Sequence, residues 1–206
     1  MYKLKFNPFT RWATRFTSPI NGPTVLTIEG IGPVHYISAF VSAAICGLGV
    51  YSSILVTLER KNTFARNQAQ VEHKYGALHR EAFGDDAKIN KFGYPDMGNN
   101  IYADLLPYKD WVSLNNAQRT HEFGYQHALV LFPNAFIAML SFPNFACTML
   151  STYAVMRFFN IRGYTSVEGH NKAFLTEISL RFHLLVLCMG AFASAFKISG
   201  GQQLVR

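Results

Sequence analysis

Two long segments of this chain contain no Asp, Glu, Lys or Arg, and they restrict the folds that the chain can adopt. The first covers residues 30–58 and is 29 residues long, and the second covers residues 123–156 and is 34 residues long. A helix of about 20 apolar residues is long enough to cross a bilayer. The second segment exceeds one crossing and contains Ser-Phe-Pro-Asn at 141–144. Because proline disfavours helix at the residue before it, we predict a turn there.

These segments predict an all-α fold, an integral membrane four-helix bundle. The predicted spans lie at about residues 33–58, 114–140, 145–160 and 173–196. The last span contains Glu177 and Arg181, which are four residues apart and can pair on one helix face. A structural ion pair near the start of the helix and a polar site between helices both explain these charges, because an unpaired charge inside a bilayer is costly.

The region between the first two spans has a different composition. Residues 59–117 hold 8 basic and 8 acidic side chains, which cancel, together with Gly-Tyr-Pro-Asp at 93–96. We predict a long, ordered extramembrane loop at 59–113, with one helix near 64–80. A tail follows the bundle at residues 198–206. The bundle itself is predicted to occupy residues 30–197.

Residues 1–29 form an N-terminal segment with an amphipathic pattern. Phe9, Trp12 and Phe16 fall on one face of a helix, and Arg11 and Arg15 fall on the other. This pattern predicts a short helix in the membrane interface. The segment has no acidic residue before position 29, which is also typical of mitochondrial targeting. We expect the mitochondrial inner membrane as the location, with the endoplasmic reticulum as the second possibility.

The net charge of +7 narrows the classes of partner. It comes from the N-terminal segment and from the ends of the spans, and no basic face is interleaved with stacking aromatics. We therefore expect membrane lipids and no nucleic acid as partners. Cys46, Cys147 and Cys188 are far apart in the sequence and form no zinc pattern. No pair of histidines is fixed for haem, so we expect no metal and no resident cofactor.

The second span begins with a polar stripe along one helix face. Its members, at i, i+4, i+7 and i+11, are Asn115, Arg119, Glu122 and Gln126. Arg119 and Glu122 can also pair at i,i+3. One interpretation is that the stripe forms polar contacts between helices at the membrane boundary. The other is a cavity for an anionic or zwitterionic small molecule, with the arginine on its carboxylate.

The stretch Gln118–Glu122, at the start of the second of four predicted spans, resembles the MAPEG superfamily of membrane-associated proteins in eicosanoid and glutathione metabolism. Within it, the resemblance is to the microsomal glutathione transferase 3 group. Ala65-Arg66 followed by Val71-Glu72 is similar to the segment after that family's first span, and Arg157–Tyr164 is similar to its exit from span three. The resemblance covers roughly residues 30–197.

The resemblance implies a homotrimer that binds glutathione between subunits near one membrane face. The family signature is Arg-x-x-x-Asn-x-x-Glu. Arg119 matches the arginine, but Phe123 stands in place of the asparagine and Gln126 in place of the glutamate. A site built for polar partners loses about 1–3 kcal/mol for each group left unpaired, so the glutathione site is degenerate. Arg157 or Arg162 would stabilise the thiolate, and Tyr153 or Tyr164 would hydrogen-bond the substrate.

Two functions remain. The first, which we favour, is a non-catalytic accessory or scaffold subunit of a mitochondrial inner-membrane complex, either of the respiratory chain or the ATP synthase. The second is an active membrane-bound glutathione transferase or peroxidase that acts on lipophilic electrophiles or lipid hydroperoxides, with glutathione as the nucleophile. The degenerate signature and the large charge-neutral loop favour the first.

Overall fold

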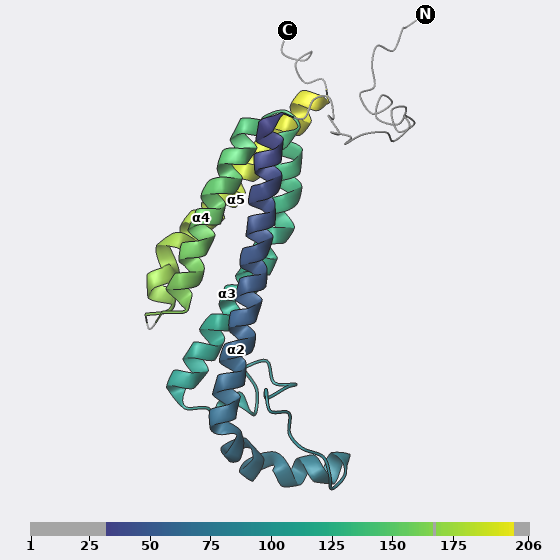
Figure 1. Cartoon of the computed structure of the whole chain (residues 1–206), viewed down its shortest axis with the longest axis vertical. Coiled ribbons are helices and arrows are strands. Elements are labelled where there is room, and N and C mark those ends of the chain that lie inside the picture. Colours follow the sequence, from purple (N-terminus) through teal and green to yellow (C-terminus); the bar gives the residue numbers. More distant parts are fainter. Residues whose placement is uncertain (1–31, 167, 200–206) are drawn as a thin grey trace, which may run out of the picture. The chain divides into compact units, whose positions relative to one another are not determined.

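The computed structural model describes residues 32–166 and 168–199, and all regular secondary structure in these residues is helical. Four long helices follow one another along the chain: α2 (Pro33–Phe83), α3 (Tyr108–Met139), α4 (Pro143–Tyr164) and α5 (His170–Ile198), with a short 3-10 turn η1 (Ala103–Leu105) before α3 (Figure 1). The all-α prediction is confirmed for this part of the chain. The predicted interfacial helix at 1–29 and most of the tail at 198–206 lie outside the described residues.

The four helices pack against one another, which is compatible with the predicted bundle. Both α3 and α4 contact all the other long helices, so α2 and α5 lie diagonally across from each other. The short turn between α3 and α4 falls at Ser141-Phe142, directly before Pro143, as the proline predicted. Leu131, Leu150 and Leu187 are fully buried in the core between the helices.

Two of the four predicted spans fall in helices that are long and apolar enough to cross a membrane. By length and composition, α2 and α5 are the helices in the described residues that could cross a membrane. The apolar stretches of α3 and α4 are interrupted by polar side chains, including Asn134 in α3 and Thr152 and Arg157 in α4. Burial of Arg157 against the other helices makes that interruption compatible with a bundle interior.

The first loop is shorter than predicted, because α2 continues without a break through residues 59–83. The predicted loop at 59–113 and the separate helix at 64–80 are therefore wrong in their bounds, and the connection covers residues 84–107. Charged residues do not end a helix. This one ends at Gly84, whose φ of 103° is a conformation that glycine adopts without strain.

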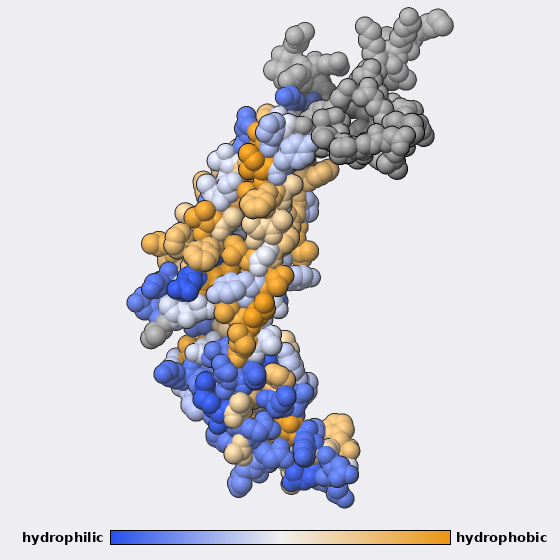
Figure 2. Space-filling view, viewed as in Figure 1, coloured by the Kyte–Doolittle hydropathy of each residue, from blue (hydrophilic) through white to orange (hydrophobic). Residues whose placement is uncertain are grey.

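The C-terminal half of α2 has its own packed partner. Phe64, Val71 and Leu114 are buried in a second hydrophobic core together with Ile89, Tyr102, Ala103 and Leu106 of the connection. Asp110, in the first turn of α3, accepts hydrogen bonds from Arg66 at 2.8 Å and from Asn67 at 2.9 Å. In Figure 2, hydrophilic residues gather over this region, whereas hydrophobic residues gather over the part where all four helices run together.

Candidate functional site

A buried carboxylate organises the connection between α2 and α3. Asp96 is 4% exposed, and its Oδ1 accepts hydrogen bonds from the backbone N–H groups of Gly98 at 2.6 Å and of Asn99 and Asn100 at 3.2 Å. Its Oδ2 accepts from Tyr102 at 2.8 Å and Ala103 at 2.9 Å. Burial by itself raises the pKa of Asp96, but these N–H donors outweigh it and hold the pKa below its ordinary value.

Arg60 joins this connection to α2. Its side chain is 1% exposed, and Nη2 donates a hydrogen bond to the backbone carbonyl of Asp96. The guanidinium also lies over the ring of Tyr94 at 4.1 Å and that of Phe64 at 5.3 Å. Burial lowers the pKa of Arg60, although nearby Tyr94 and Asp96 act in the opposite direction. Its Nε is buried and has no hydrogen-bond partner among the described residues.

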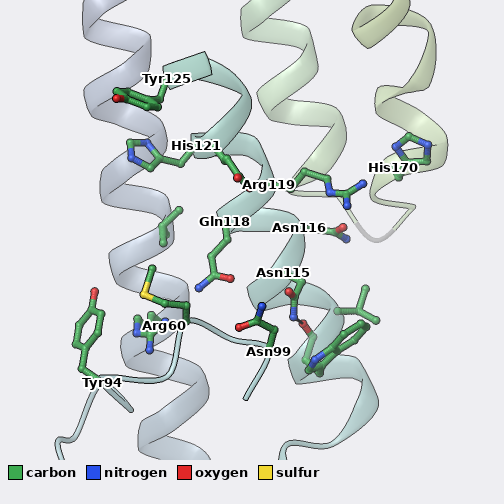
Figure 3. Close-up of a pocket in the computed structure, with 15 residues that line it drawn as sticks. Arg60, Tyr94, Asn99, Asn115, Asn116, Gln118, Arg119, His121, Tyr125 and His170 are labelled. Carbon is green, nitrogen blue, oxygen red and sulfur yellow. Dashed lines mark hydrogen bonds between the residues drawn. The ribbon is translucent and has the colours of Figure 1, made fainter. Parts of the chain in front are cut away.

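A cavity of about 780 Å³ lies between α2, α3, the connection and the start of α5 (Figure 3). The residues that line it are mostly polar: Val56, Arg60, Tyr94, Met97, Asn99, Trp111, Val112, Asn115, Asn116, Gln118, Arg119, His121, Glu122, Tyr125 and His170. In Figure 3, Arg119 extends from α3 towards His170, while Arg60 lies beside Tyr94. His121 Nδ1 lies 3.3 Å from Ser52 Oγ and connects α3 to α2 at this level.

Three members of the predicted polar stripe line this cavity, namely Asn115, Arg119 and Glu122. Gln126 does not line it, but donates a hydrogen bond to Glu122 Oε1 at 3.4 Å. Asn115 Nδ2 donates to the carbonyl of Gly98 at 3.0 Å, so the connection is fastened to α3 at the cavity wall. Arg119 is exposed and forms no ion pair within the described part of the chain, with Glu122 or any other residue.

The candidate catalytic side chains do not line this cavity, although the hydroxyl of Tyr164 lies 3.1 Å from Nδ1 of the lining residue His170. Arg157 is 2% exposed, and it donates to Asn160 Oδ1 at 2.8 Å and to the backbone carbonyl of Thr120. Tyr164 is buried as well, and its hydroxyl donates to Glu177 Oε2 at 2.5 Å. Arg162 is exposed, and none of these three candidates lines the cavity.

The remaining polar groups of the bundle form pairs inside it. Glu177 also pairs with Arg181 at 2.5 Å, so the predicted i,i+4 ion pair is confirmed. Tyr153, the other tyrosine considered for substrate binding, lies with its hydroxyl 3.2 Å from His127 Nδ1 in the core. The hydroxyl of Tyr153 and the carboxylate of Glu177 therefore already have partners among the described residues.

Phe123 faces the bundle interior. Its ring centroid lies 5.7 Å from that of His127 and 6.0 Å from that of Tyr164, and the guanidinium of Arg181 lies 5.7 Å from it. It does not line the cavity, so the space beside Arg119 is open. Phe123 therefore takes part in helix packing and leaves that space unfilled.

Neither the cysteines nor the histidines form a cluster with other ligands. Within residues 32–166 and 168–199, no group of three or more His, Cys, Asp or Glu side chains is placed to hold a metal ion. Cys46 is exposed on α2, and Cys147 and Cys188 are half-buried, all as free thiols.

The described part of the chain thus defines an all-helical protein with a cavity, lined by several polar side chains, beside the end of its longest apolar helix segment. Comparisons with protein-family models, curated proteins and solved structures found no match to this chain. The resemblance to the MAPEG superfamily stays a prediction that rests on the residues quoted above.

Proposed function

We propose that this chain is an integral membrane protein whose four helices cross the bilayer as a MAPEG-like bundle. The apolar lengths of α2 and α5 support this. So do the large apolar side chains exposed on the outer faces of all four helices, which include Phe40, Leu129, Phe158, Phe182 and Phe192. Exposing such a large apolar surface to water is unfavourable in free energy, whereas contact with apolar lipid tails is not.

Within that membrane, we assign the chain the role of a non-catalytic accessory or scaffold subunit of a larger complex. One observation carries this proposal: Arg157, Arg162 and Tyr164 are not among the residues that line the cavity that contains Arg119, and the hydroxyl of Tyr164, which lies 3.1 Å from the lining residue His170, already donates to Glu177. Glutathione chemistry needs a cation or hydrogen-bond donor at the thiolate. Arg157 donates hydrogen bonds to the Thr120 carbonyl and to Asn160, and Tyr164 donates one to Glu177.

The mitochondrial inner membrane, with a respiratory-chain or ATP synthase complex, is the location that we propose for this subunit. The acid-free, basic composition before Glu29 supports it, with the endoplasmic reticulum as the other location. The polar region formed by residues 59–113 supplies a surface outside the bilayer for contact with other subunits.

An active glutathione transferase or peroxidase is the second candidate, and the open space beside Arg119 favours it. Arg119 would bind a carboxylate of glutathione and Glu122 its amine. In a homotrimer, a neighbouring copy of the chain would have to supply the cation that stabilises the thiolate.

Two measurements on the full chain test these proposals. In nanodiscs, the non-catalytic role predicts no conjugation of a lipophilic chlorinated arene to glutathione and no calorimetric binding of glutathione tighter than millimolar. In mild detergent, the chain should co-migrate in stoichiometric amounts with a mitochondrial complex on native gels. Turnover of the arene that is lost in Arg119→Gln but kept in Lys88→Gln, at an exposed position of the connection, would overturn the non-catalytic role in favour of the enzyme.

A further inference from the structure

We propose that the cavity beside Arg119 binds the headgroup of a phospholipid that carries both a phosphate and a primary ammonium group. This inference rests on the proposed membrane insertion. On α2, the cavity is lined by Val56, inside the uncharged segment, and by Arg60, directly after that segment ends at Leu58. In a membrane-spanning α2, the cavity therefore lies at the depth of lipid headgroups.

The cavity has donors for a phosphate. Arg119 is exposed into it without an ion pair among the described residues, and a guanidinium binds phosphate oxygens with two parallel hydrogen bonds. Arg60, a second lining arginine, has a buried Nε without an acceptor in the described chain. The unsatisfied donor is a cost that an anion's oxygen, directly or through water, would remove.

Amide side chains complete this polar wall. Gln118 and Asn116 are packed so closely on the backbone that a Cβ at Gly98 would lie 2.7 Å from Gln118 Oε1, and one at Gly169 would lie 2.5 Å from Asn116 Nδ2. Both glycines have positive φ. The connection and the α4–α5 turn therefore approach the amides closely, which limits the positions that these two donors can take.

The cavity also has an acceptor for an ammonium group. Glu122 lines it one helical turn beyond Arg119, at the i,i+3 spacing that places side chains about 5–6 Å apart. The ammonium of an ethanolamine headgroup is joined to its phosphate by a short bridge, so a single headgroup can reach both side chains. A free inorganic phosphate would lack this partner and would be repelled by the Glu122 carboxylate.

An apolar surface continues from the cavity in the direction in which acyl chains would run. Tyr125 lines the cavity and is 62% exposed, and Leu129, one turn further along α3, is exposed to the same extent. A soluble tripeptide such as glutathione would leave this surface uncovered. At the opposite side of the cavity lies Trp111, a residue type enriched at the membrane interface.

Native mass spectrometry of the full chain tests the phosphate contact. The chain is delipidated in mild detergent and offered equal amounts of phosphatidylethanolamine, phosphatidylglycerol and phosphatidylcholine. We expect retention of one phosphatidylethanolamine per chain. Arg119→Gln should reduce that retention about tenfold, the equivalent of about 1.4 kcal/mol. Arg162→Gln, which removes an exposed arginine outside the cavity, should leave it unchanged. Equal effects of the two substitutions would overturn the proposal.

A second variant tests the ammonium contact. Glu122→Gln should abolish the preference for phosphatidylethanolamine over phosphatidylglycerol, whereas the exposed Glu81→Gln on α2 should keep it. Glycerophosphoethanolamine should displace the lipid only weakly, because it lacks acyl chains. Displacement by inorganic phosphate or glutathione at lower concentrations than by glycerophosphoethanolamine would overturn the assignment to a lipid.

Carbonate extraction of membranes distinguishes failure of the headgroup proposal from failure of the proposed function. If the chain stays in the membrane but retains no lipid, the headgroup site is wrong and the membrane subunit stands. If the chain is released by carbonate, membrane insertion is wrong, and the headgroup site fails with it.

Discussion

Arg60 donates a hydrogen bond from Nη2 to the backbone carbonyl of Asp96, a residue 36 positions later in the chain. Tyr94, Met97 and Asn99, close neighbours of Asp96, line the cavity. The two residues thus hold one cavity wall against α2. Arg60 binds the backbone carbonyl of Asp96, and the Asp96 carboxylate accepts hydrogen bonds from backbone N–H groups of the connection.

Asp96→Asn should loosen this wall. The amide NH₂ of asparagine would face backbone N–H donors of Tyr102 and Ala103, so two hydrogen bonds to a charged acceptor are lost. We expect a loss of about 2–3 kcal/mol in the free energy of local opening, measured by hydrogen exchange or protease cleavage within residues 84–107. Asp86→Asn, at an exposed position in the same connection, is the matched control and should change neither the rate of hydrogen exchange nor the rate of protease cleavage.

The same carboxylate makes the connection sensitive to acid. The pKa of Asp96 lies below its ordinary value of 3.8 in the folded chain, so its contribution to stability is complete above about pH 4. That contribution is lost as the pH falls through the folded pKa. Protection of residues 84–107 in the native chain should decrease in that acid range, and the decrease should be smaller in Asp96→Asn. Identical pH profiles for the two proteins would contradict this role.

Gly124 makes room for the buried guanidinium of Arg157. A Cβ at Gly124 would lie 2.6 Å from Arg157 Nη2, which donates to the Thr120 carbonyl. Gly124→Ala should therefore destabilise the bundle by about 2–3 kcal/mol in denaturant titrations of the detergent-solubilised chain. Gly47→Ala is the control, because a Cβ there meets nothing within 4 Å, and it should be neutral or slightly stabilising.

A double-mutant cycle identifies the cause of that destabilisation. In an Arg157→Met background the guanidinium is absent, so Gly124→Ala should cost at least about 1 kcal/mol less than in the native chain. Strictly additive effects would mean that Gly124 acts through another neighbour.

Phe123→Asn, which introduces the asparagine of the MAPEG signature that the sequence resembles, should not create glutathione binding. Phe123 packs against the rings of His127 and Tyr164 and does not line the cavity. We expect a loss of about 3 kcal/mol in stability from the removed ring and the buried amide, with no calorimetric binding of glutathione. Phe83→Asn, at the exposed end of α2, should leave stability unchanged. Glutathione binding that appears in Phe123→Asn alone would favour the enzyme.

Thiol labelling tests whether the first half of α2 lies in lipid. Cys46 is exposed on that half. In a variant that keeps Cys46 as the sole cysteine, sealed vesicles should protect it from a membrane-impermeant maleimide, and detergent should remove the protection. The control is a variant whose sole cysteine is introduced as Ala77→Cys, at an exposed position in the polar half of α2. In vesicles made permeable to the maleimide, so that both membrane faces are accessible, this cysteine should react equally with and without detergent. Equal reactivity at both positions in vesicles would contradict membrane insertion of α2.

Much of the helical framework could be predicted because its causes are local. The turn before Pro143 follows from the proline, and the Glu177–Arg181 pair follows from helical spacing. The same spacing placed Asn115 and Arg119 on one face, and both line the cavity. The continuation of α2 to Phe83 differs from the prediction because the charged residues at 59–61 indicate the end of an apolar span and not the end of a helix. The apolar residues Phe64 and Val71, seven positions apart, are the signal in the sequence that favours a continued helix.

The amino-acid sequence by itself determined where the chain is apolar, where its helices can start and turn, and which side chains share a helix face. Each of these depends on neighbours within a few residues. Only the tertiary structure decided that Arg60 is buried against Asp96, that Phe123 faces the bundle, and that Arg157 donates to Thr120 and Tyr164 to Glu177. These outcomes depend on contacts between residues far apart in the chain, because the rotation of each helix is set by packing against its neighbours.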